Sequence, residues 1–156
     1  MPYSMTKRNQ FLNLTFPGAS TVSYNSPNKI YLGLSSNDPV ADGGTFNELD
    51  CDTYSRLLIA RRGQDLPDYL STVAEGKIYN KKQMNFNRAT EAWTRVMGIG
   101  IFEDETGGEP IFYANIQNED GYVDVGMNQI FTFDPETFVV QFADTDVEIE
   151  ATASTT

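Results

Sequence analysis

Short runs of aromatic and β-branched residues recur along this chain about every ten residues, with turn-forming residues between them. The clearest run is Ile30–Ser35, IYLGLS, which is mostly apolar and is preceded by Asn and Pro and followed by Asn, Asp and Pro. We predict that it is a strand. Strands of this length and spacing are typical of antiparallel sandwiches and barrels. The sequence therefore predicts an all-β, mainly antiparallel fold: a single β-sandwich or jelly-roll-like domain with long loops.

Other segments differ in how clearly they favour strand. Thr53–Arg62 and Lys82–Asn87 combine apolar, aromatic or β-branched residues in strand-like patterns and are predicted strands. Pro67–Ala74 could form one short helical turn, with Asp65 as its N-terminal cap. Asn9–Phe16 fits a helix or a strand equally well, so both alternatives stay open.

Two hairpins are predicted in the second half of the chain. The run from Trp93 to Ile101 and the run IFYANIQ flank ETGGEP, where Gly107 and Gly108 can adopt the positive backbone angles of a reversal. In the second hairpin, the turn residues Asp134–Thr137 separate two alternating apolar runs. The apolar residues of these runs are Phe131 and Phe133 before the turn, and Phe138, Val140 and Phe142 after it.

The length of 156 residues suggests one folded domain, and no low-complexity linker divides the chain. We expect an N-terminal arm or short element at residues 1–20, the β-sandwich domain at 21–150, and a flexible tail at 151–156. No apolar run approaches the roughly 20 residues that cross a bilayer, and the first residues lack the apolar stretch of a secretory signal. We therefore expect neither a membrane span nor export.

The chain contains no histidine and a single cysteine, Cys51. These counts exclude Ser-His-Asp and Cys-His catalysis within the chain, a disulfide framework and a multi-cysteine zinc site. Acidic neighbours are expected to raise the pKa of the Cys51 thiol and make it a poor nucleophile. The sequence indicates no enzyme, with no catalytic residue and no cofactor.

Carboxylates are abundant but lie mostly in predicted turns, where they satisfy local backbone groups. Several crowd the loop between Asn37 and Asp52 without the spacing of an EF-hand, so no metal site is predicted. Paired glycines at Gly43-Gly44 and Gly107-Gly108 match neither a phosphate-binding loop nor a dinucleotide site.

The net charge of −11 is unevenly distributed along the chain. Up to Arg95 there are 11 basic and 9 acidic residues; from Val96 to the end there are 13 acidic residues and no basic one. Such a surface repels nucleic acids and anionic membranes, so neither is an expected partner. The acidic final third either keeps the protein soluble or docks onto a basic partner.

A series of short motifs follows in order: IYLGLSSNDP, GGTFNE, TYSRLLI, MNFN, AW, and GIGIFEDETGGEPIFYANI. Together they resemble a family of small bacteriophage virion proteins, usually labelled tail-fibre or minor tail proteins. Gly33 stands where alanine is common, Thr53 replaces the usual glycine, and a long insertion precedes Met84. The residues that match the pattern are Tyr31, Leu32, Leu34, Ser35, Asp38, Pro39, Tyr54, Arg56, Phe86, Trp93, Phe102, Gly107 and Gly108.

The resemblance implies a multi-copy virion structural protein of the tail, baseplate or fibre-attachment region, made in the host bacterial cytoplasm. Its expected partners are other virion proteins and further copies of itself. The polar N-terminal residues MPYSMTKRNQ could be an arm that becomes ordered on docking.

Three alternatives stay open beside this reading. The first is a capsid (head) decoration protein. The second is a carbohydrate-binding module that recognises a host glycan, for which Tyr69, Tyr79 or Trp93 would have to be exposed. The third is an enzyme that acts on sugars through two carboxylates.

Overall fold

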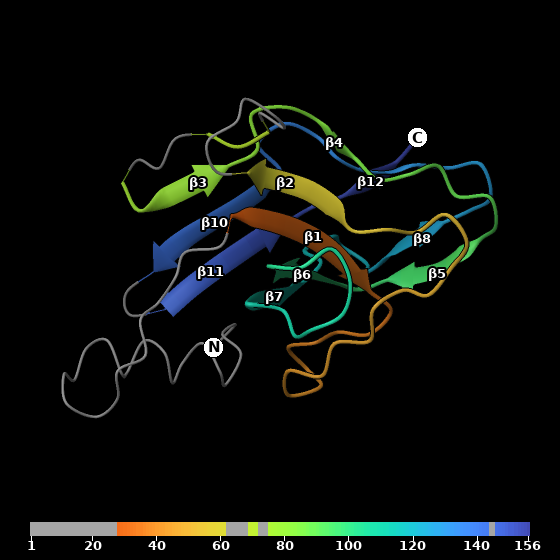
Figure 1. Cartoon of the computed structure of the whole chain (residues 1–156), viewed down its shortest axis with the longest axis horizontal. Helices are drawn as coiled ribbons and strands as arrows, with labels where there is room; N and C mark the ends of the chain where they lie inside the picture. The colour runs from red at the N-terminus through yellow and green to blue at the C-terminus, as the bar shows by residue number, and fades with distance from the viewer. Residues whose placement is uncertain (1–27, 62–68, 72–74, 144–145) are drawn as a thin grey trace.

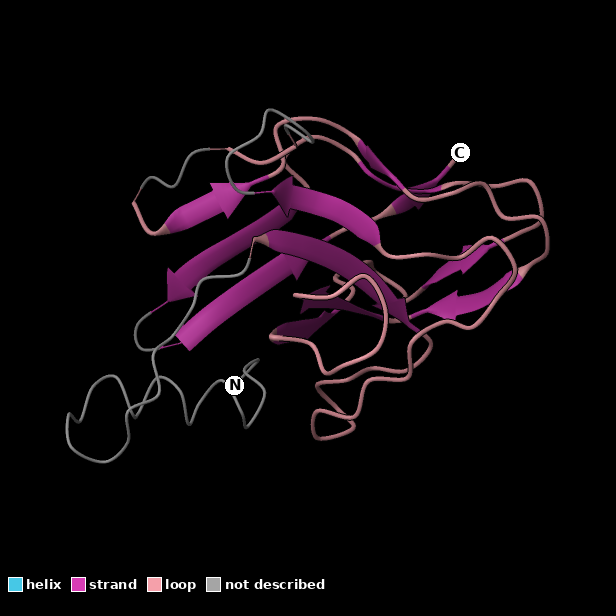
Figure 2. Cartoon of the chain, in the orientation of Figure 1, coloured by secondary structure: helices cyan, strands magenta, loops and turns pink. Residues whose placement is uncertain are grey.

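The computed structural model describes residues 28–61, 69–71, 75–143 and 146–156. All regular elements in this part of the chain are strands, and every strand pair is antiparallel (Figure 2). The predicted all-β, antiparallel fold is confirmed. The helical turn considered for Pro67–Ala74, its cap Asp65, and the segment Asn9–Phe16 lie wholly or largely outside the described residues.

The described strands form four sheets (Figure 1). The largest has the order β2-β1-β6-β7 and consists of β2 (Leu57–Arg61), β1 (Lys29–Ser35), β6 (Gly98–Phe102) and β7 (Phe112–Asn115). The second has the order β11-β10-β3 and consists of β11 (Asp146–Ala151), β10 (Phe138–Ala143) and β3 (Lys77–Tyr79). The third has the order β12-β9-β4 and consists of β12 (Ser154–Thr155), β9 (Phe131–Phe133) and β4 (Met84–Asn85). The fourth is the pair of β5 (Trp93–Val96) and β8 (Val123–Val125).

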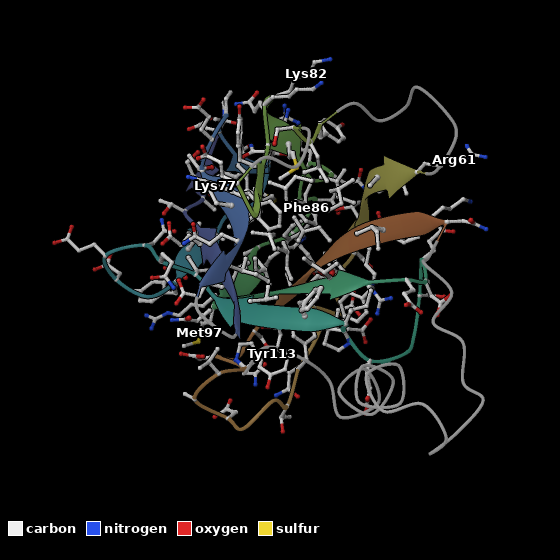
Figure 3. All side chains as sticks on the ribbon, turned by 90° about the vertical axis from the view of Figure 1, so that its left-hand side faces the viewer. Arg61, Lys77, Lys82, Phe86, Met97 and Tyr113 are labelled. Carbon is white, nitrogen blue, oxygen red and sulfur yellow. The ribbon has the colours of Figure 1, made fainter. Side chains whose placement is uncertain are left out.

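One apolar core joins these sheets in a sandwich-like arrangement. Leu32 and Leu34 of β1 and Ile99 of β6 alternate with residues that face the opposite side of the sheet, and all three are fully buried. Phe86 lies among the side chains between the sheets (Figure 3). It meets Phe131 edge-on at a centroid distance of 5.6 Å. Burial of this apolar surface is the main stabilising contribution to such a fold.

The predicted strands differ from the observed ones mainly in length. Ile30–Ser35 is confirmed by β1, whereas only the second half of Thr53–Arg62 forms β2, and only Met84–Asn85 of Lys82–Asn87 forms β4. The first hairpin is confirmed, since β6 pairs with β7. In the loop between them, Gly107 and Gly108 have φ angles of 70° and 73°.

The second predicted hairpin is wrong. The turn forms, with the Thr137 amide donating to the Asp134 carbonyl, but β9 pairs with β4 and β12 while β10 pairs with β3 and β11. The reason is Asn80, whose side chain is fully buried between the two strand ends. Its Nδ2 donates to the Asp134 carbonyl (2.7 Å), and its Oδ1 accepts the Phe138 amide (2.9 Å). Asn80 thus binds the backbone at the point where the two strands separate, and β9 is paired on its two sides with β4 and β12.

The C-terminal residues do not form the expected flexible tail. Ala151 and Ala153 are buried, and Ser154–Thr155 pairs with β9 as β12. The Asn118 side chain donates to the Ala153 carbonyl and accepts its amide, which ties the end of the chain to the domain. The proposed boundary near residue 20 lies outside the described residues and stays a prediction.

No helix in the described residues is long and apolar enough to span a membrane.

Replacing Asn80 tests its role at the point where the two strands separate. We expect Asn80→Ala to lower the free energy of unfolding by about 2–4 kcal/mol, because the buried Phe138 amide loses its acceptor. Urea unfolding followed by tryptophan fluorescence measures the change. Asn47→Ala, at an exposed position, is the matched control and should shift stability by less than about 0.5 kcal/mol. Equal effects of the two substitutions would contradict this role.

Candidate functional site

The residues that match the phage pattern converge on a buried ion pair between Arg56 and Glu48. The side chains are 2% and 27% exposed, respectively. Arg56 Nε donates to Glu48 Oε1 (2.7 Å) and Nη2 to Oε2 (2.6 Å), a two-point contact that lysine cannot reproduce. Glu48 is positioned by the backbone, because residue 48 bridges Ser35 and the next amide, that of Leu49, donates to the Leu34 carbonyl.

The remaining donors of Arg56 hold the β6–β7 loop. Nη1 donates to the Asp104 carbonyl (2.8 Å) and to the Gly107 carbonyl (2.9 Å). The guanidinium carbon lies 3.4 Å from the centre of the Phe102 ring, a cation–π contact. One guanidinium therefore joins the loop before β2, the end of β6 and the loop that follows β6.

Tyr54 extends this network into the core. Its hydroxyl accepts the Leu34 amide (2.9 Å) and donates to Glu48 Oε1 (2.8 Å). Its ring stacks parallel to Phe86 at 6.5 Å and meets Trp93 edge-on at 5.7 Å. Burial, followed by the negative charge of Glu48 among the raising influences, lifts the pKa of Tyr54 well above its usual range, so the hydroxyl stays protonated and remains a donor.

Glycines form the surface against which the network packs. A Cβ on Gly100 would lie 2.9 Å from the Phe46 ring, and one on Gly98 would lie 2.4 Å from Pro39 Cδ. A Cβ on Gly33 would lie 2.8 Å from the Phe102 ring. The glycines of β1 and β6 therefore allow the loop after β1 to lie close against the sheet.

The loop from Ser36 to Asn47 is held by its own side chains. Asn37 Nδ2 donates to Asp42 Oδ2 (2.8 Å) and to the Thr45 carbonyl (2.7 Å), and Asn37 Oδ1 accepts the Asn47 amide (2.9 Å). Asp38 Oδ1 accepts the amides of the two residues after Pro39. This loop keeps a defined shape although it is largely exposed.

The structure brings most of the pattern residues together. One continuous set of contacts joins seven of them: Leu34, Tyr54, Arg56, Phe86, Trp93, Phe102 and Gly107. Tyr31 is the register partner of Phe102, Gly108 follows Gly107 in the loop, and Asp38 and Pro39 belong to the adjoining loop. We refer to this set, with Glu48, as the Arg56 network. Its role as a structural motif stays a prediction.

Sequence reasoning missed three kinds of residue that the network depends on. Glu48 was one of several carboxylates in its loop, and nothing in the sequence marked it as the partner of Arg56. Asn37 was one of several polar residues in the same loop, and nothing in the sequence indicated that its side chain holds the loop together. Gly98 and Gly100 stood in the motif GIGIFEDETGGEPIFYANI without a role of their own, and the useful signal was their period-2 spacing within a strand.

Within the described residues no three His, Cys, Asp or Glu side chains gather in a way that could hold a metal ion. Burial, followed by the charges of Glu91 and Asp50, raises the pKa of the Cys51 thiol and suppresses its reactive thiolate. Three of the carboxylates in the loop between Asn37 and Asp52 accept hydrogen bonds within the protein: Asp42 from Asn37, Asp38 from backbone amides and Glu48 from Arg56.

Comparison with known families gives one match that spans most of the chain. Residues 2–141 match the family described as "Podophage GP4 fiber I protein gp80". No curated protein matches the sequence.

Replacing Arg56 tests whether the two-point ion pair stabilises the fold. We expect Arg56→Lys to lower the free energy of unfolding by about 2–4 kcal/mol, because lysine keeps the charge but loses the fork and the contact with Phe102. Arg95→Lys is the matched control: Arg95 also lies over a tyrosine ring and faces an aspartate, but its side chain is 59% exposed. It should cost at most about 0.5 kcal/mol in urea unfolding. A similar loss in both variants would contradict a special role for Arg56.

The raised pKa of Tyr54 predicts a pH dependence at the alkaline end. Above about pH 10, the ordinary pKa of tyrosine, the unfolded chain loses the proton that the folded protein keeps, so folding becomes less favourable as pH rises. We expect wild-type stability, relative to Tyr54→Phe, to be constant between pH 7 and 9 and to fall by up to about 1.4 kcal/mol per pH unit above pH 10. Urea unfolding across this range measures the difference. Parallel pH profiles for the two proteins would show the expectation to be wrong.

Proposed function

The chain belongs to the podophage GP4 fiber I protein gp80 family, and on this basis we propose that it is a multi-copy structural component of the tail, baseplate or fibre-attachment region of a phage particle. The observation that carries the proposal is the family match over residues 2–141. Membership supports a phage fibre-type structural protein and a component of the virion. The position in the particle, the neighbouring proteins and the copy number are the parts that we propose.

The Arg56 network supports a role that depends on shape. Hydrogen bonds from Arg56 hold the exposed loop between β6 and β7, and the ion pair fixes Glu48, which directly follows the Ser36–Asn47 loop, beside the largest sheet. Loops held in one conformation lose little entropy when they bind a partner, which favours specific protein–protein contacts. We propose that the protein acts through such contacts and not by catalysis.

Capsid decoration remains the main alternative. Nothing in the arrangement of the sheets separates a head position from a tail position, because both require a stable β domain with surface contacts. Copy number and location distinguish them.

A host glycan as a further partner is less well supported. Binding modules for sugars present exposed aromatic rings, yet Trp93 is 2% exposed, and Tyr69 and Tyr79 are half-buried. Tyr122, the partly exposed residue just before β8, has one face of its ring covered by the Arg95 guanidinium, 4.0 Å from the ring centre. Trp93 is therefore not a sugar platform. Tyr69 and Tyr79, which are partly exposed, are the remaining aromatic candidates for such a contact.

The acidic final third is partly accounted for by strand alternation. Along β11, Val147 and Ile149 are buried while Glu148 and Glu150 are exposed, so the carboxylates lie on the outer face of their sheet. A solvated acidic face explains these positions without a partner. A basic surface on a neighbouring virion protein would fit the same face.

Quantitative mass spectrometry of purified particles, combined with gold labelling of this protein, tests the proposal. We expect a few to a few tens of copies per particle, located at the tail end. Hundreds of copies over the head would replace the tail assignment with capsid decoration. Absence from particles would overturn the virion role. A known major capsid protein in the same preparation is the internal standard for copy number.

A further inference from the structure

We draw no further inference here: the strongest candidate, the pair of exposed cations Lys29 and Arg61 that face each other across β1 and β2, carries none because nothing in the described part of the chain shows what partner covers it.

Discussion

The Arg56–Glu48 ion pair is the constraint on which much of this architecture depends. A buried guanidinium is tolerated only when its charge is balanced and its donors are satisfied. Here Glu48 balances the charge, two loop carbonyls accept further hydrogen bonds, and the Phe102 ring lies against the flat face. Because these partners come from separate segments, satisfying one side chain fixes Glu48 and the β6–β7 loop relative to the largest sheet.

That arrangement has consequences for packing on both sides of β1 and β6. The core side carries branched aliphatic residues, and the opposite side carries glycines on which the loop residues Phe46 and Pro39 rest. The same two strands therefore belong to the apolar core and to the support of the exposed loops. In a fibre-family protein, this division separates the residues that stabilise the domain from those available to neighbouring proteins.

The parts of the fold that could be predicted were those governed by local pattern. β1 was recognisable because it is a continuous apolar run between turn residues, and the β6–β7 hairpin because two glycines permit its reversal. The turn Asp134–Thr137 was also recognised correctly, but the pairing of the strands beside it was not. Asn80, more than fifty residues earlier in the chain, takes the hydrogen bonds at that point, and no local signal announces such a distant partner. The ordered C-terminus was missed for a similar reason, since Asn118 and β9 hold it.

The sequence by itself determined the strand-rich class, the absence of histidine chemistry and the acidic balance of the final third, because composition and short-range periodicity are properties of the chain alone. It also carried the ordered motifs that resemble phage virion proteins. Only the tertiary structure decided which of many carboxylates pairs with Arg56 and why Gly98 and Gly100 are glycines. Each of these depends on the distance between segments far apart in sequence, and folding sets that distance through many weak contacts acting together.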